Sequence, residues 1–120
     1  RNPIDIWSAV EQHGAAATMR RIAECMLGQA NIDAVLMIFV LMPESIFDIQ
    51  ETFADILKAH PEKPVLVAAY GGTQREVAHV QDGFRGLGIP CYPTPERAIY
   101  ALSRMVAYGR FCGRTSRRGA

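Results

Sequence analysis

Two long apolar segments with few charges constrain this chain more than any other feature. Residues 33–42 have the sequence DAVLMIFVLM, and residues 63–70 have the sequence KPVLVAAY. A strand that is apolar on both of its faces belongs in a sheet that is covered on both sides, which is typical of parallel sheets. Segments with apolar residues at helical spacing precede and follow both strands. The chain is therefore predicted to alternate strands with helices.

The expected order of elements is β-α-β-α-β-α-β-α, with short connections. We expect strands at the opening NPIDIW, at 33–42, at 63–70 and at IPCY, and helices at 15–28, at 45–60, at 73–88 and from Thr94 onward. Ser45 and Thr94 are the predicted N-caps of two of these helices. The apolar residues of the last helix are expected to pack inward, namely Ala98, Ile99, Ala101, Leu102, Met105 and Val106. This order predicts an α/β fold, a three-layer sandwich around a mainly parallel sheet.

The composition is that of a soluble globular domain. The chain has 120 residues, of which 13 are basic and 12 acidic, and no segment approaches the roughly 20 apolar residues that span a bilayer. We therefore expect neither nucleic acid nor a membrane as a partner. The three cysteines form no CxxC pair, which favours a reducing, cytoplasmic compartment. Cys25 and Cys91 are expected to be small core residues.

The end of the chain differs in composition from the rest. Arg110, Arg114, Arg117 and Arg118 lie close together among small residues, a pattern that is typical of a solvated tether. We therefore predict one domain at residues 1–110 and an arginine-rich linker or disordered tail at residues 111–120. The chain starts without methionine, which suggests a piece of a longer protein.

Three loops are expected at the carboxyl ends of the predicted strands, where ligands bind in parallel α/β sheets. They are WSAVEQHG, MPES and YGGTQ. In the last of these, Gly71 and Gly72 stand directly before a helix, whose N-terminal N–H groups attract anions. Two interpretations remain open: the glycines cradle a phosphate, or they only form the tight corner between a strand and a helix.

No recognisable catalytic centre is present among the polar residues. His13, His60 and His79 lack metal-ligand spacing with any other residue, and loop exposure or helix capping explains them. Asp5 and Glu44 could do acid–base chemistry near one end of the sheet, but turn and helix-start preferences explain them equally. The phosphate-binding, dinucleotide-binding and nucleophile motifs GxxxxGK[ST], GxGxxG and GxSxG are all absent.

Five segments taken together resemble one family. They are NPIDIW, IDAVLMI, EKPVLVAAYGG, GLGIPCYPTPERAIYAL and MVAYGRF, in this order, and they extend over about residues 2–110. The set is similar to the flavodoxin-like CoA-ligase domain of the NDP-forming acyl-CoA synthetases, the superfamily of succinyl-CoA synthetase. The resemblance implies a flavodoxin-like fold and a part in the reaction of carboxylate, CoA and ATP to acyl-CoA, ADP and phosphate.

The resemblance also implies which parts of such an enzyme lie elsewhere. CoA-binding, phosphohistidine-bearing and ATP-grasp domains would be its partners, and CoA, ATP and magnesium would be bound by the full-length, ADP-forming enzyme rather than by this domain alone. No catalytic residue is expected here. The phosphate-contacting loops by resemblance contain Glu44, Ser45, Gly71, Gly72 and Thr73. The family has two glycines where this chain has MPES, and Glu44 would repel a phosphoryl group there.

Two other classes of function stay open. One is a non-catalytic regulatory or interaction module, as in acetyltransferases that carry a degenerate synthetase region. The other is a free-standing receiver-like or flavin-binding domain. A receiver would have an acidic cluster, which the predicted strand ends VLMPE and AAYGG lack. A flavin-binding domain would have a phosphate loop rich in Ser and Thr after its first strand, and the loop WSAVEQHG has one serine.

Overall fold

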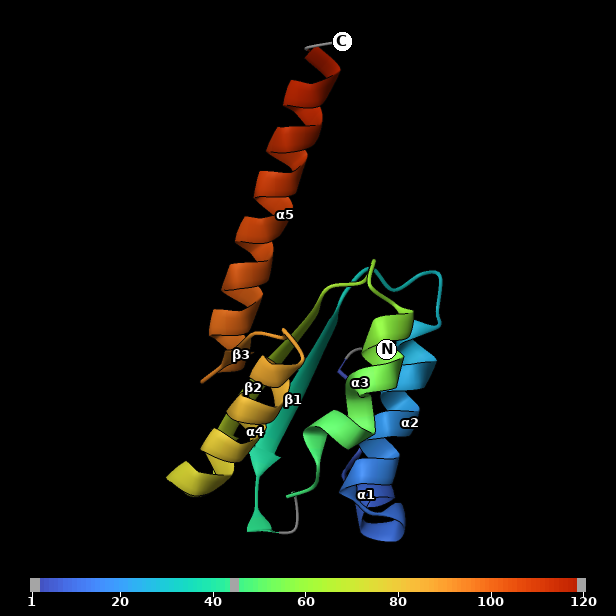
Figure 1. Cartoon of the computed structure of the whole chain (residues 1–120), viewed down its shortest axis with the longest axis vertical. Helices are drawn as coiled ribbons and strands as arrows, with labels where there is room; N and C mark the ends of the chain where they lie inside the picture. The colour runs from blue at the N-terminus through green and yellow to red at the C-terminus, as the bar shows by residue number, and fades with distance from the viewer. Residues whose placement is uncertain (1–2, 44–45, 119–120) are drawn as a thin grey trace.

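The computed structural model describes residues 3–43 and 46–118, with side chains up to Arg114 (Figure 1). Its elements are α1 (Trp7–His13), α2 (Ala15–Leu27), β1 (Val35–Leu41), α3 (Ile49–Ala59), β2 (Val65–Gly71), α4 (Gln74–Gly86), β3 (Cys91–Tyr92) and α5 (Pro95–Arg118). Strands and helices alternate from β1 onward, which confirms the α/β class.

The three strands form one parallel sheet in the order β1-β2-β3. β1 and β2 pair along their whole length, from Val35 beside Val65 to Leu41 beside Gly71. β3 adds only two residues to the other side of β2, with Tyr92 beside Ala68. The predicted parallel sheet is therefore present but small, and β1 forms one of its edges.

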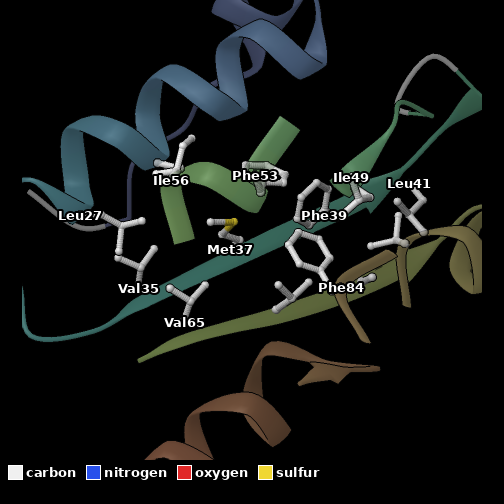
Figure 2. Close-up of a cluster of buried hydrophobic side chains, with 14 residues drawn as sticks. Leu27, Val35, Met37, Phe39, Leu41, Ile49, Phe53, Ile56, Val65 and Phe84 are labelled. Carbon is white, nitrogen blue, oxygen red and sulfur yellow. The ribbon is translucent and has the colours of Figure 1, made fainter. Parts of the chain in front are cut away.

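One face of the sheet holds the main hydrophobic core (Figure 2). Alternate residues of β1 point into it and meet side chains of α2, α3 and α4; the buried set is Ala23, Leu27, Val35, Met37, Phe39, Leu41, Ile49, Phe53, Ile56, Val65, Val67, Ala69, Val80 and Phe84. Phe84 lies 5.6 Å from Phe39 and 5.5 Å from Phe53, between ring centroids. We call this side of the sheet the helix-covered face.

The opposite face is covered in part by α5, which lies across the sheet from α2 and α3 (Figure 2). Leu66, Ala68 and Ala98 are buried there. In β1, Leu36 is partly buried on this side, whereas Ile38 is 44% and Val40 54% exposed. We call this side the open face. Helices thus lie on both sides of the sheet, as in a sandwich, but one layer is incomplete.

The opening of the chain differs from the predicted strand. The described part, residues 3–6, contains no strand, and α1 begins directly at Trp7. The Asp5 carboxylate accepts the N–H of Trp7 at 3.0 Å and so turns the chain into a helix. The expected loop WSAVEQHG is for the same reason mostly helical, and the sheet has one strand fewer than predicted among the described residues.

The start of α3 also differs from the prediction. The helix begins at Ile49, and its N-cap is Asp48, whose carboxylate accepts the N–H of Glu51 at 2.9 Å. Ser45, the predicted N-cap, lies outside the described residues. The aspartate is the better cap because its charged oxygen also interacts with the positive end of the helix. In contrast, Thr94 caps α5 as expected, since its hydroxyl accepts the N–H of Arg97 at 3.3 Å.

The last helix differs most from its prediction. Ile99, Met105 and Val106 were expected to pack inward, but they are 57%, 54% and 44% exposed. Ile99 directly follows the buried Ala98 and points to another side of the helix. For Met105 and Val106 the reason is length, because α5 has 24 residues and extends well past the ends of the strands (Figure 1). It remains helical through residues 111–118, where a linker or disordered tail was expected. The domain boundary at residue 110 stays a prediction.

Candidate functional site

The predicted site lies where β1 and β2 end side by side. Leu41 pairs with Gly71 in the last register position, so the segments that follow the two strands start from neighbouring points. Gly72 approaches β1 closely, because a Cβ added there would lie 3.0 Å from the Leu41 Cβ and 3.2 Å from its carbonyl oxygen. Gly71 and Gly72 both have positive φ, 76° and 64°, a conformation that favours glycine. The tight corner is therefore a property of this structure, and a phosphate contact at the same place stays a prediction.

The helix that follows the corner carries its own negative charge at its N-terminus. The Thr73 hydroxyl accepts the N–H of Glu76 at 3.3 Å, and the Glu76 carboxylate accepts the N–H of Thr73. This reciprocal capping box satisfies two of the amides that a bound anion would otherwise use. Glu76 is only 6% exposed. Gln74 and Arg75 supply the other N–H groups of the first turn.

Glu76 is the site residue that the sequence analysis missed. The signal was present, because Thr73 and Glu76 form the T-x-x-E pattern that begins many helices. Its consequence is electrostatic. A carboxylate beside Gly72 stabilises the positive end of α4 and at the same time lowers the affinity of that end for phosphate.

The second candidate loop is described only in part. Met42 and Pro43 follow β1 directly and lie on the same edge of the sheet as the glycine corner. Glu44 and Ser45, the predicted phosphate-contacting residues of this loop, lie outside the described residues. The first residues of the two loops therefore lie at the same edge of the sheet.

The three histidines lie on different elements of the fold, in α1, at the end of α3 and in α4. His13 is exposed in the last turn of α1. The His60 Nδ1 lies 3.6 Å from the Glu62 carboxylate. The His79 Nε2 lies 2.7 Å from the carbonyl oxygen of Phe47 and ties α4 to the segment before α3. Within residues 3–43 and 46–118, no group of three or more His, Cys, Asp and Glu side chains could hold a metal ion.

Cys91 is not an activated thiol. Burial raises the pKa of the Cys91 thiol, and the nearby Arg85 only partly opposes this, so the reactive thiolate is disfavoured at neutral pH. Cys25, expected in the core, is exposed on α2, because the buried side of that helix is formed by Thr18, Ala23 and Leu27.

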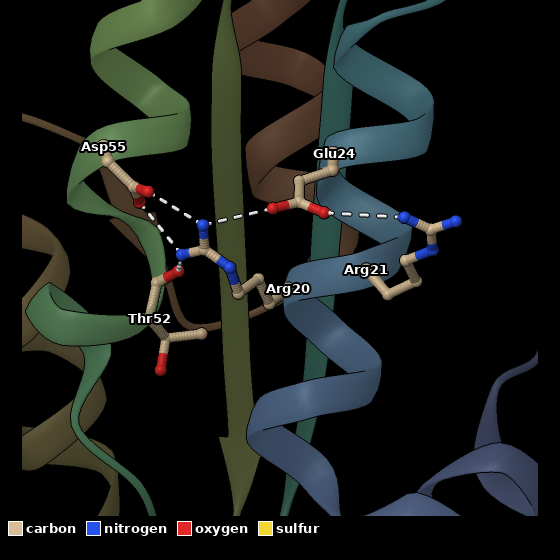
Figure 3. Close-up of polar contacts among 5 residues, drawn as sticks. All are labelled: Arg20, Arg21, Glu24, Thr52 and Asp55. Atoms are coloured by element: carbon tan, nitrogen blue, oxygen red, sulfur yellow. Dashed lines mark hydrogen bonds and ion pairs between the residues drawn. The ribbon is translucent and has the colours of Figure 1, made fainter.

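A polar cluster joins α2 to α3 on the helix-covered side (Figure 3). The Arg20 guanidinium donates to both carboxylate oxygens of Asp55, at 2.9 and 2.7 Å, and to the Thr52 carbonyl oxygen at 2.9 Å. Glu24 forms a further ion pair with Arg20 at 3.1 Å. Hydrogen bonding from Arg20 lowers the pKa of Asp55 to about 2. All donors and acceptors serve one another, so the cluster holds two helices together.

An apolar groove lies beside the edge strand of the sheet. It has a volume of about 380 Å³ and runs between the N-terminal segment with α1 and the edge strand β1. It is lined by Asp5, Ile6, Trp7, Val10, Ala15, Met19, Ile38, Phe39, Val40, Met42 and Phe47. One carboxylate among apolar side chains gives this groove no catalytic group.

Comparisons of the chain with protein-family models, with curated proteins and with solved structures find no match. Among the described residues, no helix is both long and apolar enough to cross a bilayer. Any statement about function therefore depends on the residues themselves.

Proposed function

We propose that this chain is a flavodoxin-like domain of an NDP-forming, ADP-forming acyl-CoA synthetase, where it contributes part of the phosphoryl-transfer site and of the interface between domains. The observation that supports this most is the junction of β1 and β2. Two adjacent parallel strands end at the same edge, and the Gly71-Gly72 corner lies against Leu41 at the end of β1. Backbone N–H groups in such a corner suit an anionic group delivered by another domain.

The chain's own residues would hold and orient a phosphoryl group rather than react with it. Thr73, Gln74 and Arg75 begin the helix that points toward the site, and no described histidine lies among them. The phosphohistidine, CoA, ATP and magnesium would come with neighbouring domains or the full-length enzyme. Since no described cluster fits a metal, no step is assigned to magnesium here.

A second function is favoured by one observation, the buried Glu76 carboxylate at the start of α4. A negative charge at this point opposes phosphate, and Glu44 in the other loop would do the same. Both features suit a non-catalytic regulatory or interaction module that keeps the fold of a synthetase domain without its phosphate contacts.

A phosphate titration followed by amide NMR separates the two functions. For the synthetase domain, the amide signals of Gly72, Thr73 and Gln74 should shift and saturate at millimolar phosphate, and Glu76→Gln should tighten binding severalfold by removing a charge. The start of α5 at Thr94 is the internal control, because it is a helix N-terminus away from this corner. If the signals of Gly72, Thr73 and Gln74 do not move in the wild type or in Glu76→Gln, the result would contradict a phosphate role and favour the interaction module.

A further inference from the structure

The last helix carries most of the positive charge of the chain. Residues 97–120 contain six arginines and no acidic residue, whereas residues 1–96 contain 12 acidic and seven basic residues. The nearly balanced total charge, from which no nucleic-acid partner was expected, therefore conceals a strong division between the body and α5. Since α5 extends past the ends of the strands (Figure 1), this charge lies on an element that stands out from the body. A segment of one sign attracts partners of the opposite sign.

The arginines of α5 differ from those of the body in their partners. Arg20 on α2 and Arg85 on α4 each form an ion pair with an aspartate, at 2.7 and 2.8 Å. Arg97, Arg104 and Arg110 of α5 are exposed, and in the described part of the chain none of them forms an ion pair. The described carboxylates therefore leave the charge of these arginines available to an anionic partner.

Two exposed tyrosines alternate with arginines on one side of α5. Residues three or four positions apart share a side of an α-helix, so four positions form one continuous row, namely Arg97, Tyr100, Arg104 and Tyr108. Tyr100 is 68% and Tyr108 69% exposed. Ala98, which is fully buried against the sheet, points to another side of the helix. The row, which we call the arginine–tyrosine row, therefore faces away from the sheet.

An alternation of cations and rings has the chemistry to bind a single-stranded nucleic acid. Guanidinium groups bind phosphates, and aromatic rings stack on bases. Tyr100 and Tyr108 are eight residues apart, about 12 Å along the helix axis, with Arg104 midway between them. That distance is several times the rise of about 3.4 Å between neighbouring bases of a duplex strand. Bases on the two rings would thus be unstacked from each other, as only a single strand allows, with the phosphates between them near Arg104.

Two other anionic partners fit this helix less well. Helices that lie on a membrane surface separate cations and apolar residues onto opposite faces. On α5, Arg104 lies on the same side as the tyrosines, and the side of Ala98 packs on the sheet. An acidic peptide would neutralise the arginines but offers no planar base to the rings.

We propose that the arginine–tyrosine row of α5 binds single-stranded nucleic acid, with its arginines on phosphates and its tyrosines stacked on bases. Arg110 and Arg114 are exposed on an adjacent side of the helix and add to the positive potential that attracts the strand. None of these contacts reads the edge of a base. Binding is therefore expected to be nearly independent of sequence and to weaken as the salt concentration rises.

Fluorescence anisotropy with a labelled oligothymidylate of about 12 nucleotides tests the proposal on the whole chain. Wild type is expected to bind it with a Kd of about 100 μM or lower. Tyr108→Ala should weaken binding at least about fivefold because it removes a stacking ring, whereas Tyr108→Phe should bind like wild type. Arg104→Gln should lower the slope of log K against log salt by about 0.7, the share of one phosphate contact on a single strand. Arg21→Gln is the matched charge control, because Arg21 is 86% exposed on α2, across the sheet from α5.

Three competitors separate a single strand from the other anionic partners. A duplex of the same length, polyglutamate of the same charge and vesicles that contain phosphatidylserine should each bind wild type more weakly than the oligothymidylate does. Circular dichroism checks that each variant keeps its helices. A wild type that does not bind the oligothymidylate at low salt, or a Tyr108→Ala protein that binds it as well as wild type, would overturn the proposal. Tighter binding of the vesicles, the polyglutamate or the duplex would also overturn it.

Discussion

The helix-covered face and the open face belong to the same three strands, yet they are packed to different degrees. On the helix-covered face, Phe53 and Phe84 are fully buried between β1 and three helices. On the open face, Ile38 and Val40 of the same β1 remain about half exposed, although α5 packs on part of this face. The difference indicates that packing on the helix-covered face contributes more to the stability of the fold than packing on the open face.

The largest expected effect concerns the helix-covered face. Phe53→Ala should lower the free energy of unfolding by about 3–5 kcal/mol, because it removes a buried ring and leaves a cavity. Ile38→Ala on the open face should cost less than about 1 kcal/mol, because Ile38 is already 44% exposed. Urea denaturation of both variants measures the difference. Similar losses at the two positions would show that the faces are equally important for stability.

A smaller effect is expected at the glycine corner. Gly88→Ala introduces a side chain at φ 73° into open space, and the backbone strain alone should cost about 1–2 kcal/mol. Gly72→Ala has similar strain at φ 64° and also brings the new Cβ to 2.5 Å from the Glu76 carboxylate and 3.0 Å from the Leu41 Cβ, so it should cost at least about 1 kcal/mol more. Thermal denaturation of the pair measures the added cost of crowding at the corner. An equal loss in both variants would mean that Glu76 and Leu41 move aside freely.

The smallest effect is the pH dependence of the Arg20–Asp55 contact. The pKa of Asp55 falls from 3.8 to about 2 in the folded chain, first because Arg20 donates hydrogen bonds to it. Stability from this shift is therefore fully present above about pH 4 and is lost as the pH falls toward 2. Asp55→Asn should remove that part of the acid dependence. Parallel acid-unfolding curves for wild type and Asp55→Asn between pH 4 and 2 would contradict a contribution of the Asp55 pKa shift to stability.

The sequence predicted those elements that depend on local patterns. Periodicity identified β1, β2 and α4, and the threonine that caps α5 was found from its hydroxyl and the proline after it. The prediction of a strand at the opening was wrong. The Asp5 carboxylate accepts the N–H of Trp7, and this local hydrogen bond outweighs the apolar pattern of NPIDIW. Similarly, the N-cap of α3 is Asp48 and not the predicted Ser45.

Errors of another kind came from the extent of the sheet, which a one-dimensional pattern does not contain. Met105 continues the apolar stripe of Ala98 and was expected to be buried with it, but the sheet ends before the helix does. The glycine corner was predicted correctly as a strand-to-helix turn, whereas the Glu76 carboxylate in it was not recognised. Both cases depend on which segments meet in three dimensions.

Hydrogen–deuterium exchange tests the difference between the two faces most directly. The account predicts that the amides of α4, which packs on the helix-covered face, exchange far more slowly than those of the exposed later turns of α5, residues 105–114. Exchange in residues 105–114 as slow as in α4 would contradict the claim that the helix-covered face provides most of the stability of the fold.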